Sequence, residues 1–257
     1  MKVLPLICII FEEDKLHLGI KNERVHFILF SVYIIFVALM NTIIVEGGKD
    51  MGNRIYPIGI QNFEKIRKEG YVYVDKTALM YKLVKSGSYY FLSRPRRFGK
   101  SLLISTLEAY FEAKRDLFEG LAVETLEKDW VKRPVFHLDL NIGKYDTPDS
   151  LDKILNETLD YWESLYGTRS AETTLALRFA GVVGRAYEQS GERVAILIDE
   201  YDKPLLQAIG NEELQREFRN TLKPFYGVLK TMDGCIKFAL LTGVTKFGKV
   251  SVFSDLN

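Results

Sequence analysis

The chain has 257 residues and a formal net charge of +1, with 47% hydrophobic and 27% charged residues. It is long enough for one sizeable core, and its composition is that of an ordinary globular protein. The near-neutral charge gives no overall reason to expect nucleic-acid binding. The two cysteines, Cys8 and Cys235, lie far apart, which argues against a disulfide framework and against a zinc site.

The first fifty residues differ from the rest. Residues 25–45 form an almost unbroken apolar run, about as long as the ~20 residues that cross a bilayer. The run predicts one membrane-spanning helix, although the basic residues on its two sides barely favour an orientation. The alternative is that residues 1–50 are translated upstream DNA, because Met51 resembles a natural protein start. We favour this alternative and therefore expect a cytoplasmic protein. If residues 25–45 are genuinely translated, we expect instead a protein that is anchored in the membrane by a single span.

Residues 51–88 form a lead-in to the predicted core. Asn62 is placed to cap a helix that Gly70 ends, and residues 71–74 alternate like a strand or an extended segment. Residues 75–77 then begin a helix with one apolar face, and residues 85–88 turn into the next strand. The predicted division of the chain is therefore 1–50, 51–88 and a core at 89–257.

Residues 93–101, which we call the phosphate cradle, follow a strand-like run at 89–92 and open a helical run at 102–107. A turn from strand to helix that ends Gly-Lys-Ser presents backbone amides and the positive end of a helix dipole to an anion. Lys100 would reach the terminal phosphates, and the Ser101 hydroxyl would hold Mg²⁺. Arg94 stands where the usual pattern has its first glycine. The predicted cofactor-binding residues are Arg94, Pro95, Arg96, Arg97, Phe98, Gly99, Lys100, Ser101 and Leu102.

Strand-like runs then alternate with helical ones. Residues 134–140 read as a strand, Asp149 or Ser150 as the cap of a helix, and residues 171–189 as a helix that ends at Gly191. Helices between successive strands are typical of a parallel sheet covered on its faces.

Two acids follow the next apolar run. Residues 194–198 read as a strand buried on both faces, and Asp199 and Glu200 come directly after it. Parallel sheets bind ligands at the carboxyl ends of their strands. We therefore predict that Asp199 holds Mg²⁺ and that Glu200 polarises the attacking water. The alternative is that both acids are simply exposed to solvent at the end of a strand.

A further buried strand at 236–241 precedes Thr242 and Gly243. Thr242 could sense the γ-phosphate or position water, or it could simply close the strand. Arg96 and Arg97 could lie against phosphates, supply charge at the transition state or face solvent, and we favour at least one of them near the phosphates. Asp202 could orient Lys203 or a helix start, and a structural role is favoured.

Five blocks occur in an order that resembles a known family: residues 56–60, 73–77, 94–101, 198–202 and 242–247. Together they are similar to the bacterial AAA-ATPase-like family, relatives of the archaeal ATPases, among the P-loop NTPases that use an additional catalytic glutamate. The resemblance covers residues 51–257 and accounts for Arg94, because the family dispenses with the first glycine. It implies a three-layer α/β fold with a mainly parallel sheet, and Mg-ATP binding.

Members of this family commonly continue into a nuclease-like domain of the PD-(D/E)XK type, and no such motif occurs here. We therefore expect a core that is incomplete at its carboxyl end. Any nucleic-acid contact would occur through the missing nuclease-like domain. The sequence leaves open whether the protein forms an oligomer. The leading hypothesis is an ATPase with Lys100, Glu200 and Thr242 as catalytic residues and Ser101 and Asp199 as metal ligands. The alternative is a nucleotide-gated regulatory or DNA-associated module without significant turnover.

Overall fold

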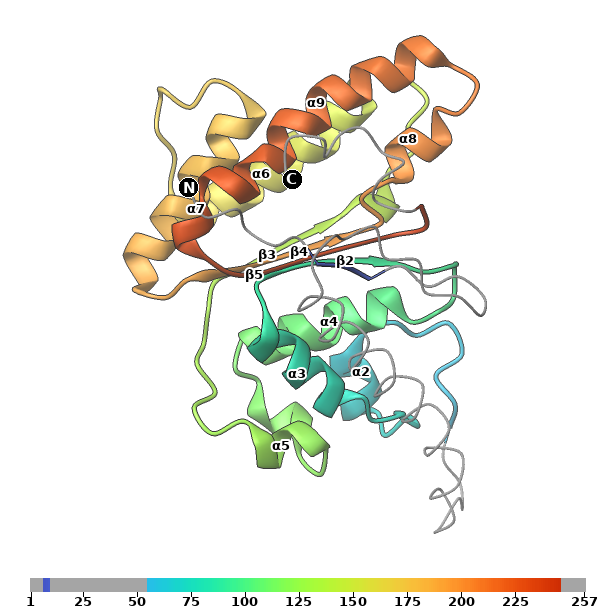
Figure 1. The fold of residues 1–257 in the computed structure, drawn as a ribbon, viewed down its shortest axis with the longest axis vertical. Coiled ribbons are helices and arrows are strands. Elements are labelled where there is room, and N and C mark those ends of the chain that lie inside the picture. The colour runs from blue at the N-terminus through green and yellow to red at the C-terminus, as the bar shows by residue number, and fades with distance from the viewer. Residues whose placement is uncertain (1–6, 10–54, 246–257) are drawn as a thin grey trace, which may run out of the picture.

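The computed structural model describes residues 7–9 and 55–245, and its centre is a parallel sheet between two layers of helices (Figure 1). The sheet has the strand order β1-β2-β5-β4-β3, and every neighbouring pair is parallel. The strands are β1 (Ile7–Ile9), β2 (Tyr89–Ser93), β3 (Val135–Asp139), β4 (Val194–Asp199) and β5 (Ile236–Gly243). The three-layer α/β fold expected from the sequence is confirmed.

The helices divide between the two faces of the sheet. One layer contains α2 (Phe63–Lys68), α3 (Thr77–Ser86), α4 (Lys100–Phe111) and α5 (Ala122–Leu126). The other contains α6 (Asp149–Tyr166), α7 (Leu175–Ser190), α8 (Lys203–Gln207) and α9 (Glu212–Thr231). Short 3₁₀ turns occur at Arg115–Phe118, Leu140–Ile142 and Asp233–Cys235.

Strand β4 shows why its sequence is a continuous apolar run. Val194, Ile196 and Ile198 pack in the hydrophobic cluster beneath α6, α7 and α9. Ala195 and Leu197 belong to the cluster beneath α3 and α4. Since successive side chains of a strand point to opposite faces, burial on both faces requires apolar residues at every position.

Several local predictions are confirmed and others need correction. Asn62 caps α2 by accepting a hydrogen bond from the Lys65 amide, at 2.8 Å. Residues 71–74 are extended but carry no strand assignment. Helix α6 begins at Asp149, so Asp149 is its first residue rather than its cap, because Pro148 already has helical dihedrals. Helix α7 begins at Leu175 instead of 171, because the Thr174 side chain caps it.

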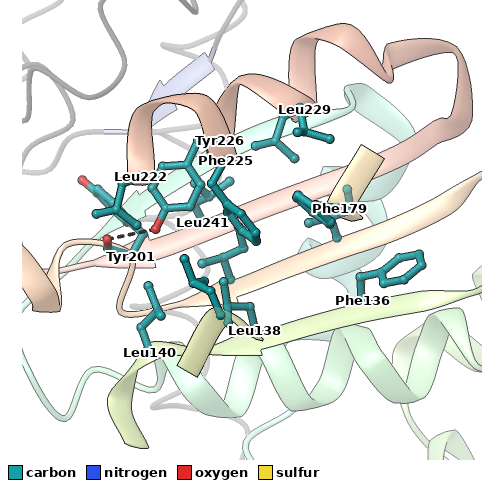
Figure 2. Packing of buried hydrophobic residues seen from close by; sticks show 14 of the residues in the cluster. Phe136, Leu138, Leu140, Phe179, Tyr201, Leu222, Phe225, Tyr226, Leu229 and Leu241 are labelled. Carbon is teal, nitrogen blue, oxygen red and sulfur yellow. Dashed lines mark hydrogen bonds between the residues drawn. The ribbon is translucent and has the colours of Figure 1, made fainter. Parts of the chain in front are cut away.

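Helix α9 was not predicted from the sequence. It is 20 residues long and contains Pro224, a residue that normally interrupts a helix because it removes one hydrogen bond. Its buried face compensates for that loss, since Phe218, Leu222, Phe225 and Leu229 recur at helical spacing and pack on the sheet side. Figure 2 shows this face packed against residues of β3, β5 and α7.

The aromatic centre of this layer should dominate its stability. Phe179 is fully buried and stacks on Phe225, with 4.6 Å between ring centroids. We expect Phe179→Ala to lower the free energy of unfolding by about 3–5 kcal/mol, because it leaves a cavity between α7 and α9. Leu177→Ala is the matched control on the same helix, since Leu177 is 50% exposed, and it should change stability by less than ~0.5 kcal/mol. Urea unfolding measures both, and equal effects would contradict this packing.

The predicted membrane span at 25–45 lies outside the described residues. Within the part of the chain that is described, no helix combines the length and the apolar character needed to cross a bilayer. The division of the chain at residues 50 and 88 stays a prediction.

Candidate functional site

The candidate site lies where the parallel strands end. Ser93 of β2 pairs in register with Gly243 of β5, and Asp139 of β3 pairs with Asp199 of β4. Because parallel strands share a direction, the residues that follow them meet at one edge of the sheet. The phosphate cradle and the two acids, which are distant in sequence, are thereby brought together.

The cradle leaves β2 and opens α4 through a strained turn. Arg97 has a φ of 69° and Gly99 a φ of 75°, both in the left-handed region. Gly99 tolerates this conformation because it lacks a Cβ atom, and its carbonyl accepts the first helical hydrogen bond from Leu103. Residues 95–99 are exposed, including Phe98 at 64%. The turn therefore presents the amino end of a 12-residue helix at the sheet edge.

Lys100 is the buried cation of the site, with 4% of its surface exposed. Its ammonium lies 3.1 Å from Glu200 Oε1, and it donates to the carbonyls of Arg94 at 3.1 Å and Pro95 at 3.4 Å. An ammonium has three donors, so these contacts use its full capacity. The sequence predicted that both residues belong to the site, and the structure joins them directly.

The acids form a tight turn at the end of β4. Asp199 is 3% exposed, and its Oδ1 accepts from the Glu200 amide at 3.1 Å. Glu200 has a φ of 54°, a conformation that costs a residue with a side chain about 1–2 kcal/mol. Such strain persists where surrounding contacts impose it, and it is common at functional sites. We call residues 199–202 the acid turn.

Thr242 supports the acid turn. Its hydroxyl donates to Asp199 Oδ1, its carbonyl accepts from the Tyr201 amide at 2.8 Å, and the residue is fully buried. Tyr226 of α9 donates to the Tyr201 carbonyl at 3.1 Å, as Figure 2 shows. The contact of Thr242 with a γ-phosphate stays a prediction.

The remaining cradle residues differ in burial. Ser101 and Leu102 are half-buried in the first turn of α4, whereas Pro95, Arg96 and Arg97 are exposed. Arg94 is half-buried, and its amide donates to the Gly243 carbonyl at 3.1 Å. Burial lowers the pKa of the Arg94 guanidinium. The cradle is thus attached to β5 as well as to α4.

Asp202 does not hold Lys203, which was one alternative considered from the sequence, and its contacts are structural, as the sequence favoured. The Lys203 ammonium donates instead to the carbonyl and side chain of Asn141. Asp202 precedes α8 without a side-chain capping bond, and its carboxylate accepts from the amides of Val244 and Thr245.

Asp139 and His137 lie beside the site and were given no role from the sequence. Asp139 is the last residue of β3, as Asp199 is the last residue of β4. This shared position at the end of a strand is the sequence feature that could have identified Asp139. His137 Nδ1 lies 3.3 Å from Glu108 Oε2 on α4. Burial lowers the pKa of His137, but the hydrogen bond and charge of Glu108, together with the charges of Asp139 and Asp199, raise the pKa overall.

Within residues 7–9 and 55–245, no group of three or more His, Cys, Asp or Glu side chains is arranged to hold a metal ion. The Asp199 carboxylate and the Ser101 hydroxyl are the metal ligands predicted from the sequence, and this role stays a prediction. Oxygen donors of this kind suit Mg²⁺, which typically retains waters and shares its remaining ligands with phosphates.

A parallel sheet flanked by helices, in which a Gly-Lys-Ser turn follows one strand and two acids end another, defines a P-loop NTPase-like domain. The family model described as predicted AAA-ATPase matches residues 57–253, and the chain belongs to this family. The family predicted from the five sequence blocks is therefore confirmed.

One curated relative extends the comparison. The chain is 42% identical over 209 residues to a protein of Azotobacter chroococcum mcd 1 described as an uncharacterized protein in the vnfD 5' region. The alignment covers 80% of this chain and 40% of that protein. The chain thus spans well under half the length of this relative. No solved structure gives a significant match.

Proposed function

We propose that the phosphate cradle binds ATP together with Mg²⁺ and that the chain hydrolyses the γ-phosphate. The observation that carries this proposal is the 3.1 Å contact between the Lys100 ammonium and the Glu200 carboxylate. It brings the phosphate-binding cation and the candidate base to one point of the sheet edge, beside Asp199. A buried lysine paired to an acid in a purely structural role would not require the strained turns on both sides.

Lys100 and the first turn of α4 would bind the phosphates. The first amides of a helix have no acceptor within the helix, so those of residues 100–102 are available to an anion. The ammonium would exchange Glu200 for phosphate oxygens, because its three donors are already used. Arg96 and Arg97, both exposed on the cradle, could add charge at the transferring group.

Ser101 and Asp199 would hold the metal. Mg²⁺, when bound, supplies positive charge that offsets the charge developing on the phosphates. The Thr242 hydroxyl donates to Asp199 Oδ1 and so fixes the orientation of this carboxylate. Thr242 would therefore act through Asp199 in addition to any contact of its own with the nucleotide.

Glu200 would accept the proton of the attacking water. Once phosphates engage Lys100, the Glu200 carboxylate is released from its ion pair and becomes available as a base. Its 16% side-chain exposure leaves access for water at the sheet edge. The two acids thus take separate roles, one at the metal and the other at the nucleophile.

The direct test is phosphate release from ATP by the purified chain, with and without Mg²⁺. We expect release in Mg²⁺ that falls to background when EDTA removes the metal, because Asp199 and Ser101 would then lack the ion that they orient. Release that is unaffected by EDTA would contradict the metal role.

A second outcome would select the other candidate function. ATP binding without phosphate release would favour a nucleotide-gated regulatory or DNA-associated module, for which the exposed Arg96 and Arg97 offer a contact surface. Nucleic-acid contact, oligomer formation and membrane attachment through residues 25–45 stay predictions from the sequence.

A further inference from the structure

Asp202 is a fully buried carboxylate whose partners lie in the segment that follows β5. It has 0% exposure and stands at the end of the acid turn, three residues after Asp199. Its Oδ2 accepts from the Val244 amide at 3.0 Å, from the Thr245 amide at 2.6 Å and from the Thr245 hydroxyl. The charge is thus stabilised by hydrogen bonds from the segment that follows β5.

The segment 243–245 is also attached to the cradle. The Arg94 amide donates to the Gly243 carbonyl at 3.1 Å, and the Ser93 hydroxyl donates to the Val244 carbonyl at 3.0 Å. From the acid turn, the Tyr201 hydroxyl donates to the Thr245 carbonyl at 3.0 Å. The segment therefore lies between the cradle and the acid turn and is bonded to both.

The approach at Gly243 is close. A Cβ atom there would lie 2.6 Å from Asp202 Oδ1 and 2.6 Å from Tyr201 Cε1. A side chain at position 243 would thus push the segment off the acid turn. Glycine and a buried aspartate together permit the contact.

We propose that Asp202 is a positioning residue for the ATPase site. By holding segment 243–245, it fixes Thr242, which orients Asp199, and it fixes Arg94, whose carbonyl accepts from Lys100. In this proposal Asp202 acts through its hydrogen bonds to Val244 and Thr245. The inference rests on the proposed function for its effect on turnover, but the positioning itself can be measured without ATP.

Asp202→Asn is the informative substitution because it keeps the shape of the side chain. Asparagine keeps one acceptor oxygen for the Val244 and Thr245 donors but removes the negative charge that strengthens these bonds. Its NH₂ group takes the place of Oδ1, which lies 3.3 Å from the Val244 amide, itself a donor. We expect kcat for ATP to fall roughly 10- to 100-fold, as small misplacements of catalytic groups do, while KM stays within about threefold.

The matched control is Asp75→Asn. Asp75 is another carboxylate that accepts from backbone amides and a threonine hydroxyl, those of Thr77 and Ala122, but it joins α3 to α5. Its loss should affect stability without changing kcat per folded molecule. Thr245→Val is a milder second variant that removes one donor to Asp202 and retains the buried charge, and its kcat should fall less.

Amide hydrogen exchange of the ligand-free protein separates this proposal from the proposed function. In Asp202→Asn we expect faster exchange at residues 244 and 245 and also at Arg94, whose amide donates to the Gly243 carbonyl. Faster exchange confined to 244 and 245, or an unchanged kcat in an active enzyme, would overturn the positioning role. If the wild-type chain released no phosphate, the proposed turnover would fail, and exchange at Arg94 would still decide whether Asp202 positions the cradle.

Discussion

Lys100→Ala is expected to weaken ATP binding by about 10- to 150-fold, which corresponds to the ~1.5–3 kcal/mol of a hydrogen bond to a charged group. The reason is that Lys100 supplies the buried cation of the cradle, at 4% exposure. Titration of ATP in the presence of Mg²⁺ measures the change in affinity. An affinity equal to that of the wild type would show that the phosphates bind elsewhere.

The control for this experiment is Lys114→Ala. Lys114 follows the other end of α4 and pairs with Glu64 and Glu112 at the surface. The Lys114→Ala substitution removes the same charge from the same layer of helices and should leave ATP affinity unchanged. Thermal unfolding of both variants checks the fold, because Lys100→Ala leaves Glu200 without its cation.

Glu200→Gln should lower phosphate release by about 10²–10⁴-fold, the usual contribution of a general base. Binding should respond differently. The neutral amide loses the ion pair with Lys100, so ATP no longer competes with a carboxylate for that ammonium, and we expect an affinity equal to or higher than that of the wild type. The combination of lost turnover and retained binding is the signature of the proposed role.

Glu192→Gln is the control for this variant. Glu192 lies two residues before β4, at the end of the strand opposite to the acid turn, and pairs with Arg133. The Glu192→Gln substitution should leave both phosphate release and ATP affinity unchanged. Phosphate release that survives in Glu200→Gln would assign the base to another residue, and a parallel loss of ATP affinity would give Glu200 a binding role.

Much of the fold could be predicted because the central strands are short, largely apolar runs. Residues 194–198 of β4 are buried on both faces, so this part of the strand contains no polar position that would obscure the pattern. Helix α9 escaped prediction because Pro224 and Gly227 interrupt its sequence, whereas its stability comes from the packing of Phe218, Leu222 and Phe225. Tertiary packing overrides local propensity there.

The sequence names the candidate residues of the site, whose roles stay predictions, but it does not give their contacts. Gly-Lys-Ser and the acids after β4 identify the residues, because both patterns are local. The partners of Asp202 lie 43 positions away at Thr245, and those of Thr242 lie 43 positions away at Asp199. Sequence patterns within one element contain no information on such pairs. The parallel register of β4 and β5 creates them.

The central claim is that the cradle binds ATP, and equilibrium binding of ATP to the unmodified chain in Mg²⁺ tests it most directly. Calorimetric titration with Lys100→Ala beside the wild type supplies the comparison. The account predicts saturable binding to the wild type and a loss of affinity in the variant. Absence of saturable binding at millimolar ATP, in a chain shown to be folded, would contradict it.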